Sequence, residues 1–127
     1  MNNQQPKKII LIVEDDLGLL EVLTDKFERE GFGVIVAENG LDGFNMANTK
    51  RPDLILIDIV LPVMDGMTMM GKLREENEWG KTVPIILLTN LSADDDERAR
   101  EVAKNEPAYY LVKSDWSLED IVRKVKE

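Results

Sequence analysis

Short, unbroken runs of branched apolar residues alternate along this chain with longer segments that have helical spacing. Such runs are typical of strands that are buried on both faces of a parallel sheet. The runs that we interpret as strands are Ile9–Val13, Val34–Ala37, Leu54–Ile57, Val83–Leu88 and Tyr110–Val112. This alternation constrains the fold more than any other feature, because a parallel sheet needs a crossover connection after each strand.

The segments between these runs carry the signals of amphipathic helices. Apolar residues share one helix face at Leu20, Leu23 and Phe27 in the first segment and at Leu118, Ile121, Val122 and Val125 in the last. N-caps are expected at Asp16, Ser92 and Ser117, and Gly31 should close the first helix. The pattern predicts an α/β fold, a (βα)5 doubly wound five-stranded parallel sheet of flavodoxin-like order 2-1-3-4-5.

The length and composition predict one domain without thiol or imidazole chemistry. The chain has 127 residues, which fits a single core, and we expect residues 8–127 to form it after a flexible tail at residues 1–7. It contains no cysteine and no histidine, so disulfides, zinc fingers and a histidine base or phosphocarrier are excluded. Carboxylates and hydroxyls must therefore carry any chemistry.

The charge of the chain argues against two classes of partner. A formal net charge of −9 disfavours direct binding to nucleic acid or to an anionic membrane surface. The first apolar stretch, Ile9–Val13, is too short for a signal peptide or a membrane span. We therefore expect a cytoplasmic protein whose partners are proteins and a metal ion.

Polar residues follow the predicted strands at the edge where their carboxyl ends should meet. Glu14, Asp15 and Asp16 follow the first strand, and Asp58 ends the third. Thr89 and Lys113 follow the fourth and the fifth. Four carboxylates at one rim suit Mg²⁺, which is usually held by one or two carboxylates, water and phosphate. The hydroxyl and the ammonium group could bind phosphoryl oxygens.

Four sequence blocks stand in an order and spacing that resemble bacterial response-regulator receiver domains, the stand-alone chemotaxis-regulator type included. They are IILIVEDD, PDLILIDIVLPVMDG, IILLTN and YYLVKS. The resemblance implies that Asp58 accepts a phosphoryl group and that Mg²⁺ is held by Asp58, Asp15, Glu14 in part through water, and the Val60 carbonyl. It also implies that Thr89 and Lys113 bind the phosphoryl group and that Thr89 and Tyr110 act as a switch.

The same resemblance implies a signalling role in a two-component system and no more enzymatic activity than slow self-dephosphorylation. The expected partners are a sensor histidine kinase or phosphotransfer protein and a downstream protein target, with the chain monomeric or weakly dimeric when phosphorylated. Val60 and Leu91 are apolar where polar residues would help to position water, so hydrolysis should be slow. Lys113 is followed by Ser114, where the family usually has proline.

The sequence can be compared with three alternatives to a phosphorylated switch. A phosphatase of the haloacid-dehalogenase type needs a carboxylate two residues after its nucleophile, where this chain has Val60. A flavin binder should have a glycine- and hydroxyl-rich phosphate loop after its first strand, where this chain has acidic residues. A receiver-like module that binds a partner without phosphorylation is the remaining alternative, and the presence of all the reactive residues argues against it.

Overall fold

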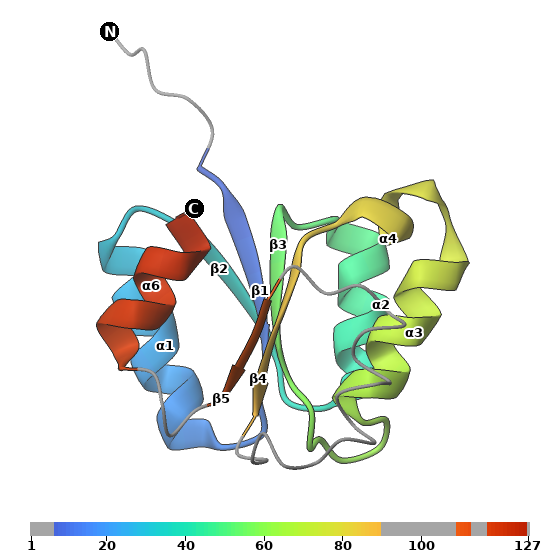
Figure 1. The fold of residues 1–127 in the computed structure, drawn as a ribbon, viewed down its shortest axis with the longest axis horizontal. Coiled ribbons are helices and arrows are strands. Elements are labelled where there is room, and N and C mark those ends of the chain that lie inside the picture. Colours follow the sequence, from blue (N-terminus) through green and yellow to red (C-terminus); the bar gives the residue numbers. More distant parts are fainter. Residues whose placement is uncertain (1–6, 90–108, 113–116, 127) are drawn as a thin grey trace, which may run out of the picture.

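A five-stranded parallel sheet forms the centre of the molecule, with helices on both of its faces (Figure 1). The computed structural model describes residues 7–89, 109–112 and 117–126. The strands are β1 (Ile9–Val13), β2 (Gly33–Ala37), β3 (Leu54–Asp58), β4 (Ile85–Thr89) and β5 (Tyr109–Val112). Their spatial order is β2-β1-β3-β4-β5, and all four pairings are parallel, which confirms the predicted topology.

The helices are divided between the two faces of the sheet (Figure 1). They are α1 (Leu17–Arg29), α2 (Gly40–Lys50), α3 (Gly66–Glu76), α4 (Glu78–Thr82) and α6 (Leu118–Lys126). In Figure 1, α1 and α6 cover one face, and α2, α3 and α4 lie on the other. The short α4 was not predicted. Its N-cap is Asn77, whose side chain accepts a hydrogen bond from the Gly80 amide (2.8 Å), and the five residues of the helix are too few to show a helical period.

The helix ends follow the predicted capping residues. The Asp16 side chain accepts a hydrogen bond from the Leu19 amide (3.2 Å), and Gly31 closes α1 with φ of 98°. Ser117 and Asp120 form a reciprocal capping box, with both hydrogen bonds at 3.1 Å. Ser92 lies outside the described residues. Strand β4 begins two residues later than predicted, because Pro84 accepts a ladder hydrogen bond but has no N–H to donate.

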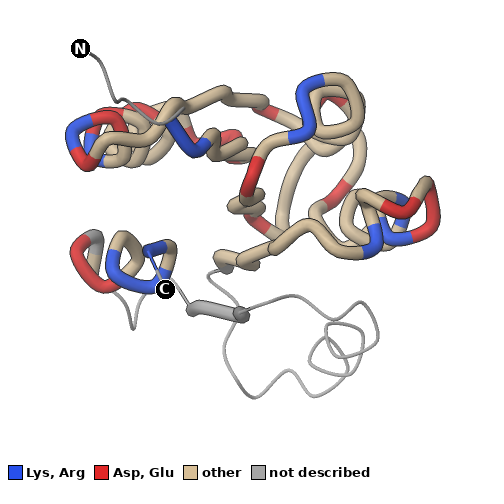
Figure 2. The backbone as a smooth tube through the Cα atoms, turned by 90° about the horizontal axis from the view of Figure 1, so that it is seen from above, with Lys and Arg blue, Asp and Glu red and all other residues tan. Residues whose placement is uncertain are grey.

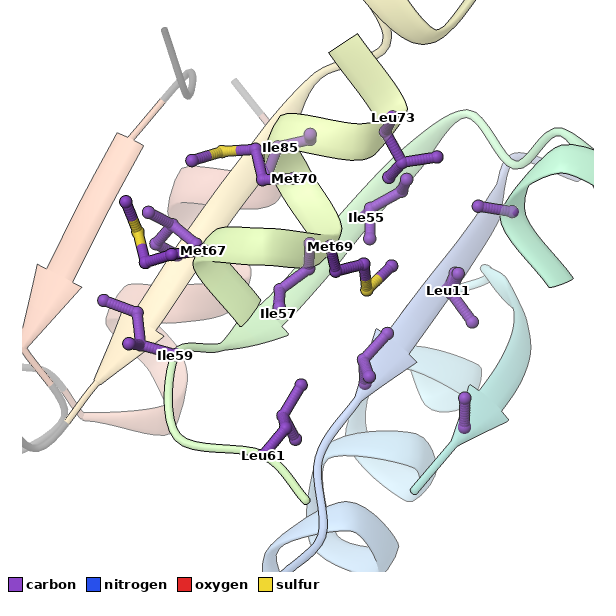
Figure 3. Close-up of a cluster of buried hydrophobic side chains, with 14 of the residues drawn as sticks. Leu11, Ile55, Ile57, Ile59, Leu61, Met67, Met69, Met70, Leu73 and Ile85 are labelled. Carbon is purple, nitrogen blue, oxygen red and sulfur yellow. The ribbon is translucent and has the colours of Figure 1, made fainter. Parts of the chain in front are cut away.

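The core has two layers, because successive strand residues point to opposite faces of the sheet. Ile10 and Ile12 pack toward α1 and α6, and the alternate residues of β1 pack toward α2 and α3. Figure 3 shows the second layer, in which Met69, Met70 and Leu73 of α3 lie over the sheet. These three side chains are fully buried. Within the described ranges, every helix is too short or too polar to span a bilayer.

Candidate functional site

Three of the predicted carboxylates meet at the carboxyl edge of the sheet. Strands β1 and β3 are neighbours, with Val13 level with Ile57, so the residues that follow β1 lie beside Asp58. Glu14, Asp15 and Asp58 each place one carboxylate oxygen so that all three oxygens lie within 4.8 Å of one another. This spacing is small enough for one cation to contact all three side chains.

The backbone fixes the two buried members of this cluster. Glu14 is 3% exposed; its N–H donates to the Ala37 carbonyl (3.0 Å), and its Oε2 accepts from the Asp16 amide (3.2 Å). Asp58 is 8% exposed, and its Oδ1 accepts from the Val60 amide (3.2 Å). Asp15 is exposed, so it stands at the mouth of the site. The fourth rim carboxylate, Asp16, instead caps α1.

The loop after Asp58 contains a strained turn. The Met64 amide donates to the Pro62 carbonyl (2.7 Å), and Val63 between them has φ of 69°. These two features match a γ-turn with a positive φ, which is a rare and strained form. A β-branched residue such as valine is an outlier at positive φ. Val63 is 77% exposed, so no packing of its own side chain explains the conformation. Strain of this kind persists where the surrounding structure holds the backbone in place.

Two glycines hold this loop by close backbone contact. A Cβ atom on Gly66 would lie 2.2 Å from the Asp58 carbonyl oxygen, and one on Gly40 would lie 1.7 Å from the Met64 carbonyl oxygen. The first residues of α3 and α2 therefore press directly on the backbone that carries the site. The sequence pattern does not predict this role. The only signal was that each glycine follows an N-cap residue, Asp65 or Asn39.

The other predicted residues are located only in part. Thr89 ends β4, one residue beyond Leu88, which is level with Asp58, so its backbone lies on the adjacent strand at the same edge. Tyr110 lies in β5, level with Leu87. Lys113 comes directly after β5 and, with Leu91, lies outside the described residues.

The donor set of the acidic cluster suits a small hard cation. It consists of carboxylate oxygens only, which Mg²⁺ and Ca²⁺ prefer over nitrogen or sulfur ligands. The buried Glu14 and Asp58 side chains are held by hydrogen bonds from backbone amides, and the Asp15 side chain is exposed to solvent. Such a site leaves coordination positions open to water and to a ligand, which is the arrangement typical of Mg²⁺.

The fold and this site together define a doubly wound α/β protein with a candidate cation site at the carboxyl edge of its sheet. The model of the response regulator receiver domain family matches residues 10–126, and the chain therefore belongs to that family. Receiver domains are signalling domains, and the family works in two-component, phosphorylation-based signal transduction.

Individual relatives agree with this assignment. The transcriptional activator protein PfeR of Pseudomonas aeruginosa is 38% identical over 91 residues, 72% of this chain and 28% of PfeR. The receiver domain of the Francisella response regulator 1452 is 29% identical, with TM-score 0.83 and 94% of each chain covered. The receiver domain of the P. aeruginosa sensor histidine kinase PA1611, solved with magnesium in its active-site cleft, is 28% identical, with TM-score 0.83 over 95% of this chain and 96% of that one. The chain spans 28% to 47% of the length of the curated relatives compared.

Proposed function

We propose that this receiver domain accepts a phosphoryl group on the Asp58 carboxylate and thereby switches a protein-binding face. The observation that carries the proposal is the position of Asp58, buried at a strand end within 4.8 Å of two further carboxylates. Burying a charged group is costly unless an opposite charge offsets it, and a cation at this cluster would supply that charge beside the attacking oxygen. The boundaries that we propose for the domain are residues 8–127, after a tail at 1–7.

The proposed donor is a phosphohistidine on a sensor histidine kinase or phosphotransfer protein. An oxygen of the Asp58 carboxylate attacks phosphorus in line, a P–O bond forms, and the P–N bond breaks with its electron pair returning to the imidazole. The Val60 amide, which donates to Oδ1, orients the carboxylate for this attack. The γ-turn and the two glycines keep that amide in place.

Glu14, Asp15 and Asp58 with the Val60 carbonyl are the ligands that we propose for Mg²⁺. When bound, the ion would neutralise charge on the phosphoryl oxygens and on the carboxylates around them. The magnesium in the PA1611 receiver domain supports this proposal by similarity. Asp15 is the exposed ligand, so its replacement should weaken binding with the least effect on the fold.

The switch that we propose consists of Thr89, Lys113 and Tyr110. An aspartyl phosphate adds a dianion whose oxygens can accept from the Thr89 hydroxyl and the Lys113 ammonium group. A shift of Thr89 would pass to β5 through the β4–β5 pairing, in which Thr89 is level with Val112. Tyr110 lies in the same strand and would change rotamer with it.

The proposed output is a changed affinity for a downstream protein target rather than direct nucleic-acid binding. The net charge of −9 supports this choice, because it opposes contact with phosphate backbones. Several relatives are transcriptional regulators, and the matched region covers only 28% of PfeR and 35% of PhoP, so we do not propose their output for this chain. We propose a cytoplasmic domain that is monomeric or dimerises weakly on phosphorylation.

Intact mass spectrometry after incubation with Mg²⁺ and a small phosphodonor tests the proposal. The wild type should gain one phosphoryl mass, and Asp58→Asn should gain none. Asp42→Asn is the matched control, because it removes one exposed carboxylate on α2 outside the cluster and should label like the wild type. An unlabelled wild-type protein would favour an interaction module without phosphorylation, and labelling of Asp58→Asn would reject the assigned residue.

A further inference from the structure

Strand β2 forms one edge of the sheet, and within the described part of the chain its outer side has no strand partner. The Gly33 amide donates to the Lys8 carbonyl (2.9 Å), so Gly33 turns its backbone groups toward β1. Successive residues of a parallel strand turn their backbone groups to opposite sides. Val34 and Val36 therefore direct their N–H and C=O groups away from β1, where a further strand can pair with them.

The edge of β2 lacks the features that usually protect a sheet edge. Natural edges are often shielded by charged residues, proline or a β-bulge. The five residues of β2 are GVIVA, without charge or proline, and they pair with β1 in an unbroken register. Viewed from above, β2 lies at the end of the sheet between α1 and α2 (Figure 2). Such an edge is a template for pairing with an extended segment.

Two grooves flank this edge, one on each face of the sheet. The groove toward α1 has a volume of about 850 Å³, and the groove toward α2 has a volume of about 560 Å³. Val36 lines both grooves and is 38% exposed, so the two grooves meet at the outer side of β2. On the α1 side, Leu17 is 60% exposed and Val22 is 51% exposed. The side chains of an added strand would alternate between the two grooves.

The groove toward α1 is acidic. Glu21, Asp25 and Glu28 line it, and among its described lining residues there is no lysine or arginine. Asp25 forms an ion pair with Arg29 (3.1 Å). Glu21 and Glu28 are exposed, and neither forms an ion pair with a described lysine or arginine. Two exposed carboxylates therefore remain to attract a cationic side chain that lies beside β2.

The groove toward α2 also carries a negative charge. Its charged lining residues are Glu38 and Asp42 against the single ammonium group of Lys50. A second copy of this chain paired at the same edge would bring acidic grooves together, and the net charge of −9 adds to that repulsion. The charge of both grooves therefore favours a basic partner over self-pairing.

We propose that the outer edge of β2 binds an extended basic segment of a partner protein, which pairs with β2 as an additional strand. Hydrogen bonds to the backbone of Val34 and Val36 hold the segment, and Glu21 and Glu28 select lysine or arginine side chains on the α1 side. The exposed apolar surface of Val22 packs against the hydrocarbon stems of these side chains. None of these residues belongs to the acidic cluster, so the proposal does not depend on phosphorylation.

The test is a titration of the full chain with a capped heptapeptide of alternating lysine and valine, followed by amide hydrogen exchange. The Val34 and Val36 amides should exchange about tenfold more slowly when about 90% of the chain is bound, because exchange then requires dissociation of the peptide. The Gly33 and Ile35 amides already face β1 and should change little. No saturation below about 10 mM peptide, or no added protection of Val34 and Val36, would overturn the proposal.

Two further peptides separate strand pairing from attraction by charge. The same heptapeptide with D configuration at its third and fourth residues keeps the composition and the charge but cannot form a regular strand. A heptapeptide of alternating glutamate and valine has the opposite charge. Both should bind at least about threefold more weakly than the first peptide. Equal binding of the peptide with D residues would show attraction by charge alone and would contradict pairing with β2.

A matched pair of double variants tests the local role of the carboxylates. Glu21→Gln with Glu28→Gln should weaken binding of the lysine–valine peptide by about threefold to tenfold, because each exposed ion pair contributes up to about fivefold. Glu75→Gln with Glu76→Gln, at the end of α3, changes the net charge equally and should bind like the wild type. Equal losses in both would contradict the proposal. Concentration-dependent protection of the two valine amides without peptide would assign the edge to a second copy of the chain and would also overturn it.

Discussion

Replacing Gly66 with alanine should displace the backbone that carries Asp58. The new Cβ would lie 2.2 Å from the Asp58 carbonyl oxygen, 2.8 Å from Ile57 Cγ2 and 2.9 Å from Ile59 Cα. Two of these are backbone atoms, so no rotamer change can relieve the contact, and α3 or β3 must move. Overpacking of this kind costs about 1–3 kcal/mol, and the better helix propensity of alanine offsets at most about 1 kcal/mol. We expect a net loss of about 1–2 kcal/mol.

Gly18→Ala is the matched control for this change. A Cβ on Gly18, in the first turn of α1, would meet only Asp16 Oδ1 at 3.5 Å, an ordinary contact. This variant should be as stable as the wild type or up to about 1 kcal/mol more stable. Urea unfolding followed by circular dichroism measures both variants. Equal stability of Gly66→Ala and Gly18→Ala would refute the reasoning about close backbone approach.

The same pair of variants tests whether the contact also positions the candidate site. Because Gly66 presses on the Asp58 backbone, its replacement should weaken Mg²⁺ binding under conditions in which the variant is fully folded. Gly18→Ala should bind Mg²⁺ like the wild type. Calorimetric titration gives both affinities, and an unchanged affinity in Gly66→Ala would show that the contact serves the fold alone.

Three further predictions concern the core, the acid response and the lifetime of the signal. Leu73→Ala should cost about 2–5 kcal/mol in urea unfolding, because this fully buried side chain would leave a cavity; a loss below about 1 kcal/mol would contradict the packing. Lys126 lowers the pKa of the Glu30 carboxyl in the folded protein. The ion pair therefore stabilises the fold at pH values above the pKa that Glu30 has in the unfolded chain, and this stabilisation is lost as the pH falls through the lower folded pKa. Glu30→Gln should therefore lose less stability in acid than the wild type, and parallel melting profiles against pH would reject this. Val60→Asn should release phosphate faster than the wild type, since Val60 is 59% exposed beside Asp58 and offers water no side-chain hydrogen bond; equal release rates would place the control of lifetime elsewhere.

The sheet could be predicted because its strands are encoded locally. Ile9–Val13 and Leu54–Ile57 have no polar residue to place in solvent, so only a sheet covered on both faces can hold them. Once that sheet is parallel, the carboxyl ends of adjacent strands meet at one edge. This is why the proximity of Glu14, Asp15 and Asp58 could be predicted without any knowledge of side-chain geometry.

The features that the sequence did not reveal depend on contacts between distant segments. Gly40 is the first residue of α2, and nothing near it in the sequence indicates that Met64 will lie against it. The positive φ of Val63 is likewise imposed by its surroundings, because valine disfavours it. The ion pair of Lys26 with Glu119 (2.6 Å) joins α1 to α6 and could not be inferred from either helix alone.

Asp58, and no other carboxylate of this chain, is the phosphoryl acceptor that we propose. Borohydride reduction of the phosphorylated protein, followed by peptide mapping, tests it most directly, because reduction converts an aspartyl phosphate into homoserine at the modified position. We expect homoserine at position 58 alone, formed in the presence of Mg²⁺ and absent when the metal is chelated. Homoserine at Asp15, Asp65 or another position, or labelling at Asp58 that does not depend on the metal, would contradict it.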